Sequence, residues 1–343
     1  MSIPGSERTA PVFVVGSARS GTTLLYHTLL STGQYAVYRG EPAVFDLLQP
    51  RYGDLSRRSS RRRLLREWPR SHLARASGFD DPRACEQLLD SVRSNGEFLR
   101  QVMSALAARQ GVPRWAAWGP DNLLLMPWIK RELPDARFIH MVRDGRDVAL
   151  SIGTEGWIRP FPWDRRDAFL VAAMHWQWKL QRARIHAPAL GGDYLELHFE
   201  ALVERRSDAL SRLAQFLGHA IDPAAVEQEA MGTLCHRNST FGTDRADPVG
   251  RWRRHLTPRD VTSIERAIGA TLEAFGYECS TARSADARSL ASVLYPRWFS
   301  AKHALRTHTV FGRAVDPGRL RLDASVTRPT AARSMPAENT RAW

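Results

Sequence analysis

The chain has 343 residues, of which 43% are hydrophobic and 25% are charged, and its formal net charge is +13. This composition is that of a globular protein with one large core, and it excludes a fibrous or wholly disordered chain. No apolar run reaches the ~18 residues that span a bilayer, and residues 1–10 lack the pattern of a secretory signal. We therefore predict a cytoplasmic protein without a membrane span.

The cysteines and the basic residues narrow the choice of partners. Cys85, Cys235 and Cys279 are far apart and form no CxxC pair, so we expect no disulfide framework and no metal site. The basic residues are scattered, apart from residues 57–66 and the tail, and no zinc-finger or RNA-recognition signature accompanies them. We expect no nucleic-acid partner, and we interpret residues 57–66 as a solvated basic face.

Three segments have the pattern of a buried strand that leads through a loop into a helix. Strands are expected at residues 11–16, 136–142 and 194–199. Helical spacing of apolar residues follows each of them, at about residues 22–30, 148–152 and 207–217. Such alternation predicts an α/β fold, with a central parallel sheet flanked by helices.

The rest of the chain up to Cys279 is mainly helical in pattern, at residues 55–110 and 163–185. Thr257 is followed by proline and then by Asp260, which is typical of a capped helix, and that helix is expected to end at Gly276.

The composition changes after Cys279 to serine, alanine, arginine, threonine and proline, with one apolar island at residues 290–299. We assign residues 1–283 to one domain and residues 284–343 to a basic extension that is partly disordered.

The loop from Gly16 to Thr23 (GSARSGTT) is the first motif that points to chemistry. A turn between a buried strand and a helix presents backbone N–H groups and the positive end of the helix dipole, and both favour phosphate. The glycine spacing imitates a Walker A loop, but Thr22 stands at the lysine position and the cation, Arg19, lies inside the loop. No convincing strand ends in a magnesium-binding aspartate, which disfavours a kinase or NTPase. A purely structural turn is the alternative.

Arg143 leaves the second strand, and Ser151 lies two helical turns downstream, so the two side chains could jointly bind a phosphate. With both motifs in this order, the sequence resembles the sulfotransferases that use 3'-phosphoadenosine 5'-phosphosulfate (PAPS). It is closest to the branch with the tyrosylprotein sulfotransferases and bacterial Arg-Ser-Gly-Thr-Thr enzymes. The resemblance covers about residues 11–279, because it continues through residues 198–203, 238–242, 250–253 and 276–278.

The resemblance implies a P-loop-like sulfotransferase fold and a set of nucleotide-binding residues. In that family the first loop binds the 5'-phosphosulfate, and the strand-borne arginine binds the 3'-phosphate with the downstream serine. By resemblance, these roles fall to Arg19, Ser20, Gly21, Thr22 and Thr23, and to Arg143 and Ser151. Phe199 takes the place near adenine, and Ser239 and Arg251 are further candidates. A packed ring and a surface salt bridge are the structural alternatives for Phe199 and Arg251.

Glu41 is the candidate general base, because the related branch has a Gly-Glu pair that carries this carboxylate. If Glu41 is half-buried beside the sulfonate, its pKa is expected to rise. A structural acid in a Gly-Pro turn is the alternative. His27 and His140 are other candidates, since other branches use histidine, but a helix and a buried strand favour packing roles for them.

The sequence departs from the family at two positions. Trp118 stands where many relatives have a lysine that touches the sulfonate, and Glu155 stands where the branch has an arginine. Charge stabilisation then falls on Arg19 and the loop amides, or on Arg159. Trp118, Trp157 and Trp163 are candidates for the wall of the acceptor site.

We predict an enzyme that transfers a sulfuryl group from PAPS to a hydroxyl of a small-molecule acceptor, which we expect to be a specialised metabolite. In-line displacement needs no metal, and Glu41 and Arg19 are the catalytic candidates. One alternative is a nucleotide-dependent kinase or NTPase, which magnesium dependence would reveal. Another is a catalytically silent nucleotide-binding member of the fold, which the missing lysine favours and Glu41 disfavours.

Overall fold

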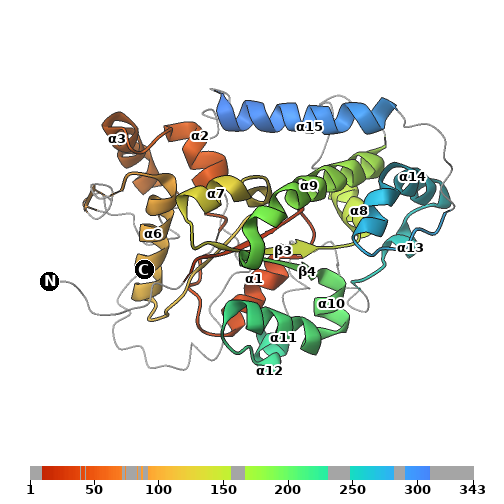
Figure 1. Ribbon diagram of the computed structural model, residues 1–343, viewed down its shortest axis with the longest axis horizontal. Helices are drawn as coiled ribbons and strands as arrows, with labels where there is room; N and C mark the ends of the chain where they lie inside the picture. The colour runs from red at the N-terminus through yellow and green to blue at the C-terminus, as the bar shows by residue number, and fades with distance from the viewer. Residues whose placement is uncertain are drawn as a thin grey trace.

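The computed structural model describes residues 10–38, 40–42, 44–71, 74, 83, 86–87, 92–155, 167–230, 248–281 and 290–309. A parallel sheet of order β2-β1-β3-β4 lies at the centre of this part of the chain (Figure 1). Its strands are β1 (Val12–Gly16), β2 (Ala116–Trp118), β3 (Arg137–Val142) and β4 (Tyr194–His198). The α/β fold with a central parallel sheet is therefore confirmed, and three strands lie where the sequence predicts them.

β2 was not predicted, because a run of three residues, two alanines and Trp118, carries too little periodicity to distinguish a strand. It pairs in parallel with β1, with Val14 opposite Trp118. Beyond the strand, the N–H of Gly119 donates to the carbonyl oxygen of Val14 at 3.2 Å. β2 therefore carries Trp118 and Gly119 to the carboxyl ends of the strands, beside the end of β1.

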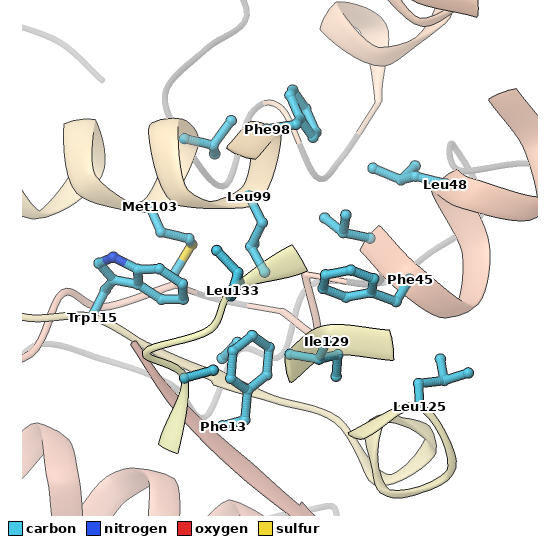
Figure 2. Packing of buried hydrophobic residues seen from close by; sticks show 14 of the residues in the cluster. Phe13, Phe45, Leu48, Phe98, Leu99, Met103, Trp115, Leu125, Ile129 and Leu133 are labelled. Carbon is cyan, nitrogen blue, oxygen red and sulfur yellow. The ribbon is translucent and has the colours of Figure 1, made fainter. Parts of the chain in front are cut away.

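Helices cover both faces of the sheet because alternate residues of each strand point to opposite faces. Phe13 of β1 packs on one face with side chains of α6 (Asn95–Arg109) and α7 (Met126–Glu132), and Figure 2 shows it near Leu133 and Ile129. Val12 and Val14 pack on the other face against α1 (Thr22–Ser31), α10 (Phe199–Glu204) and α11 (Arg206–Leu217). The sheet is thus buried on both sides, as a parallel sheet requires.

A third apolar cluster lies beyond the end of β3, among the helices at the carboxyl side. It joins α8 (Gly145–Glu155), α9 (Ala168–Leu190), α13 (Trp252–His255), α14 (Pro258–Ala274) and α15 (Leu290–His308). Phe299 of α15 is buried in this cluster, so α15 packs on the domain, although it lies in the predicted extension. The division at residue 283 stays a prediction.

The other helices are short. They are α2 (Gln49–Tyr52), α3 (Arg58–Glu67), α12 (Pro223–Ala225), the 3-10 turns at Trp68–Arg70, Pro120–Leu124 and Gly191–Asp193, and the π turns at Val44–Leu48 and Val226–Ala230.

The start of α14 follows the predicted capping pattern. The Thr257 hydroxyl accepts from the Asp260 N–H, and the Asp260 carboxylate accepts from the Thr257 N–H, each at 3.2 Å. Gly276 follows the end of the helix with a φ of 80°, a left-handed conformation that glycine adopts without steric cost. The helix prediction is therefore confirmed.

A buried ionic network joins the start of α8 to α14. Arg146 donates to Glu265 at 2.5 Å and to Asp144 at 2.8 Å, and its guanidinium lies 3.9 Å from the Trp252 ring centroid. The backbone N–H groups of residues 280 and 281 also donate to Glu265. Burial acts to raise the pKa of Glu265, but the hydrogen bonds outweigh it and lower the pKa to about 2.

We predict that Glu265→Gln lowers the free energy of unfolding by about 3 kcal/mol at neutral pH. The folded-state pKa lies below the ordinary value of 4.5, so the stabilisation is present above that value and is lost as the pH falls towards about 2. Denaturant unfolding between pH 7 and pH 2 measures this difference. Glu273→Gln, at an exposed position of the same helix, is the matched control. Equal losses for both variants at every pH would contradict the prediction.

Candidate functional site

The strand order locates the candidate site. The chain passes from β1 to β2 on one side and then to β3 on the other side of β1. In open parallel sheets, ligands bind at such a switch point, outside the carboxyl ends of the strands. The loop from Ser17 to Gly21 follows β1 at this point, and Arg143 follows β3.

The loop after β1 has the backbone of an anion-binding turn. The residues at its centre and end, Arg19 (φ 68°) and Gly21 (φ 93°), are left-handed, and the N–H of Ser20 donates to the carbonyl oxygen of Ser17 at 3.2 Å. The hydroxyls of Ser17 and Ser20 are buried and have no hydrogen-bond partner among the described residues. Buried hydroxyls are normally paired, so this loop fits a ligand with oxygen atoms, such as a phosphate or sulfate group.

The two predicted motifs meet in space. Arg19 Nε donates to Ser151 Oγ at 2.8 Å, which ties the loop to α8. Arg143 Nη1 donates to the Arg19 carbonyl oxygen at 3.1 Å, and Arg143 Nη2 donates to the Pro248 carbonyl oxygen at 2.7 Å. The structure thus brings Arg19, Arg143 and Ser151 together, although more than 120 residues separate the first from the other two.

Phe199 lies beneath the same loop. Its ring is buried, with the guanidinium of Arg143 at 4.4 Å from the centroid. A Cβ added to Gly21 would stand 2.4 Å from Phe199 Cδ2, so the ring packs directly against the loop. Phe199 therefore supports the loop as a packed ring, and its predicted place beside an adenine stays a prediction.

Asp147 is a residue of the site that the sequence reasoning did not single out. Its carboxylate accepts from the N–H groups of Gly250 (2.8 Å) and Trp252 (2.9 Å), and lies 3.8 Å from Arg143 Nη2. Burial raises the pKa of Asp147, while Arg143 and the two N–H groups favour the charged form. Asp147 therefore holds the turn that carries Arg251, and its place four residues after Arg143 was a signal that the sequence offered.

Glu41 lies near Gly119, the residue that follows β2. Its Oε2 is 3.6 Å from the position that a Cβ on Gly119 would occupy. The side chain is exposed, so the half-buried position considered from the sequence is not the one that the structure shows. Glu41 thus stands at the same sheet edge as the loop, in contact with solvent.

Trp118 is almost fully buried, at 7% exposure, and its ring stacks on Tyr26 with the centroids 5.7 Å apart. Most of this indole packs between β2 and α1, which leaves little of it to line an acceptor site, and its predicted role stays a prediction. His27 is also buried, and so is His140, which bonds to the Tyr194 hydroxyl at 2.6 Å. Burial lowers the pKa of His140 to about 3, so it is neutral at physiological pH.

Lys179 of α9 holds the segment that follows β2. Its buried Nζ donates to Asp121 Oδ1 at 2.8 Å and to the Pro120 carbonyl oxygen at 3.3 Å, and Arg306 of α15 donates to Asp121 Oδ2 at 3.2 Å. The Lys179 charge holds the pKa of Asp121 far below its usual range. No local pattern predicts this contact, because Lys179 and Arg306 lie 58 and 185 residues from Asp121.

Several predicted positions lie outside the described residues: Trp157, Arg159, Trp163 and Ser239. Within the described ranges, no three His, Cys, Asp or Glu side chains gather in a way that could hold a metal ion. None of the helices described is long and apolar enough to cross a bilayer.

The strand order and the loop between β1 and α1 define a P-loop-like α/β protein. A model of the sulfotransferase family matches residues 11–223, which is more than half of the chain. The chain therefore belongs to the sulfotransferase family, and it is an enzyme. Its motifs had predicted this family.

Individual relatives match this chain at low sequence identity. Protein-tyrosine sulfotransferase A of Caenorhabditis elegans is 24% identical over 284 residues, which cover 80% of this chain and 69% of the relative. A putative protein-tyrosine sulfotransferase of the same organism is 26% identical over 105 residues, which cover 31% of this chain and 40% of the relative.

Solved structures resemble the chain at low identity. The sulfotransferase domain of the Synechococcus PCC 7002 olefin synthase is 19% identical, with a TM-score of 0.47 and coverage of 87% of this chain and 97% of that one. Sulfotransferase STF9 from Mycobacterium avium is 16% identical, with a TM-score of 0.44 and coverage of 81% and 79%.

The contact between Gly21 and Phe199 predicts a cost that is specific to this loop. Gly21→Ala strains a left-handed backbone and also drives a methyl group into the Phe199 ring, so we expect a loss of about 3 kcal/mol in unfolding free energy. Gly33→Ala is the control, because Gly33 is also left-handed (φ 68°) but has nothing within 4 Å of an added Cβ. It should lose about 1 kcal/mol. Denaturant unfolding measures both, and equal losses would argue against the packed loop.

Proposed function

We propose that the enzyme transfers a sulfuryl group from PAPS to a hydroxyl of a small-molecule acceptor, with Glu41 as the general base. The observation that carries the proposal is the meeting of Arg19, Arg143 and Ser151 around the loop with the two unpartnered serine hydroxyls. A nucleotide with phosphate groups at both its 5' and 3' positions needs two anion sites of this kind, and ATP needs only one.

The order of the groups along the sheet edge supports the same donor. Glu41 lies beside the end of β2, the loop follows β1, Arg143 follows β3, and Phe199 follows β4. A donor bound along this row would present its sulfuryl group at the loop and its 3'-phosphate at Arg143. The acceptor would then enter from the side of β2, next to Glu41.

PAPS, when bound, would supply a sulfuryl group that is joined to the 5'-phosphate of the nucleotide. The rest of the nucleotide leaves as 3'-phosphoadenosine 5'-phosphate (PAP). Glu41 takes the proton of the acceptor hydroxyl while the acceptor oxygen bonds to sulfur and the sulfur–oxygen bond to the 5'-phosphate breaks. Arg19 and the loop N–H groups stabilise the negative charge that develops on the leaving oxygen. No described residue is needed as a metal ligand in this scheme.

Ser151 tests the donor assignment. Ser151→Ala removes the hydroxyl that accepts from Arg19, so we expect the affinity for PAP to fall about tenfold by calorimetry. Thr154→Ala is the matched control on the same helix, because that exposed hydroxyl bonds only within its own helix, to the Leu150 carbonyl oxygen. ATP and ADP should bind more weakly than PAP. If ATP bound as tightly as PAP and Ser151→Ala changed nothing, a kinase or NTPase would replace the proposal.

Glu41 tests the base assignment. Glu41→Gln keeps the size of the side chain but cannot accept a proton, so kcat should fall by about 100-fold or more, with the calorimetric affinity for PAP unchanged. Full turnover by this variant would remove Glu41 as the base and leave the donor assignment standing. Loss of PAP binding would instead show that Glu41 holds the nucleotide.

A tyrosine hydroxyl is the second candidate acceptor. The similarity to a protein-tyrosine sulfotransferase over 80% of this chain favours it. Turnover of a tyrosine-containing acidic peptide, compared with free phenols and aliphatic alcohols at equal concentration, separates the two classes of acceptor.

A further inference from the structure

The outward face of α15 is apolar where a solvent-facing helix is normally polar. Leu294 and Leu305 are 54% and 47% exposed. With Trp298 and Ala301 they follow the spacing i, i+4, i+7, i+11, so the four residues form one line along the helix, which we call the α15 stripe. Trp298 is partly buried, because it also packs against the third apolar cluster. The opposite side of α15 buries Phe299 against the core. α15 is thus apolar on two faces, and no described residue covers Leu294 or Leu305.

Basic side chains border the α15 stripe on both sides. At about 100° per residue, Arg297 falls on one side of the stripe with His308, and Lys302 falls on the other. All three are exposed, and the sequence of α15 contains no acidic residue. Neither Arg297 nor Lys302 forms an ion pair in the part of the chain that the structure describes. An apolar line between two basic borders is the pattern of a helix that lies in an anionic membrane interface.

We propose that the α15 stripe docks the protein on the surface of an anionic lipid bilayer, with Leu294 and Leu305 inserted among the lipids and Arg297 and Lys302 at the headgroups. α15 lies along one edge of the molecule (Figure 1), so the stripe and both basic borders can meet one plane together. α2 contacts α15 and leads to the arginine-rich α3, which adds positive charge beside it.

Charge disfavours the other possible occupants of the stripe. Residues 310–343 carry six arginines against three acidic residues, so this tail is repelled by Arg297 and Lys302. A second copy of the chain in a two-fold dimer would bring the same basic borders together, which is also repulsive. A surface of anionic headgroups is attracted by both borders.

Vesicle flotation of the full-length protein tests the proposal. Vesicles of phosphatidylcholine with phosphatidylglycerol should bind the protein, and vesicles of phosphatidylcholine alone should bind it weakly. Leu294→Ser combined with Leu305→Ser should lower the partition coefficient at least about tenfold. Ile185→Ser is the matched control, because Ile185 is 66% exposed on α9 and lies outside the stripe.

A second pair of variants tests the charge. Arg297→Gln with Lys302→Gln should lower binding to the anionic vesicles about 25-fold, since each charge near such a surface adds about 1 kcal/mol. Arg205→Gln with Arg212→Gln, two exposed positions at α11 on the other side of the molecule, should change it less than about twofold. Thermal unfolding by circular dichroism confirms that each variant is folded.

Three results would overturn the proposal: no binding of the unaltered protein to anionic vesicles, equal binding by the serine variant, or equal losses for the two pairs of glutamine variants. Sedimentation separates the remaining occupants. A dimer that the serine variant abolishes, without vesicle binding, would assign the stripe to a second copy. Binding to a soluble acidic polypeptide in preference to anionic vesicles would assign it to an acidic protein.

Discussion

The buried guanidinium of Arg143 is the interaction on which the arrangement of the site depends. It is only 4% exposed, and a charge withdrawn from water needs polar partners on several sides. Those partners are the carbonyl oxygens of Arg19 and Pro248, the carboxylate of Asp147 and the face of the Phe199 ring. Because each partner belongs to a different segment, one side chain fixes the loop after β1, the start of α10 and the turn after Pro248 relative to the end of β3.

The parallel sheet makes this convergence possible. All of its strands end at the same edge, about 4.8 Å apart, so the residues that follow β2, β1, β3 and β4 form a row in that order. Glu41 is not in the sheet, but its carboxylate lies next to Gly119, which places it beside the β2 end of the row. The brace of Lys179 on Asp121 fixes the β2 end of the row, and the hydrogen bond from Gly250 to Asp147 fixes the turn beside Arg143. A rigid edge of this kind can position a donor and an acceptor without a large movement of the chain.

The sequence predicted what depends on neighbouring residues. The β-branched run before Gly16 and the capped helix after Thr257 are local patterns, and both are confirmed. Arg143 and Ser151 were also predicted, from a strand end and a helical spacing, and the structure brings them to Arg19. β2 was not predicted, because three residues are too few to show a periodic pattern.

Other features depend on partners that no local pattern reveals. Arg146 and Glu265 are 119 residues apart in the sequence. Each has a charged side chain, which from the sequence alone would be expected at the surface. α15 was seen only as an apolar island, because its packing depends on the surface of α9. The exposure of Glu41 was also beyond the sequence, since a Gly-Glu-Pro turn does not say how much of the carboxylate the fold will cover.

Trp118 is an uncharged residue at the end of β2. The indole brings no charge to the end of β2, and Lys179, which contacts the segment after β2, is paired with Asp121. Positive potential at the loop then comes from Arg19, the N–H groups and the end of α1. Arg19 holds this place in a left-handed conformation that costs a residue with a side chain about 1 kcal/mol or more, and Ser151 fixes its guanidinium. Strain retained at a charged residue of a binding loop is typical of a functional position.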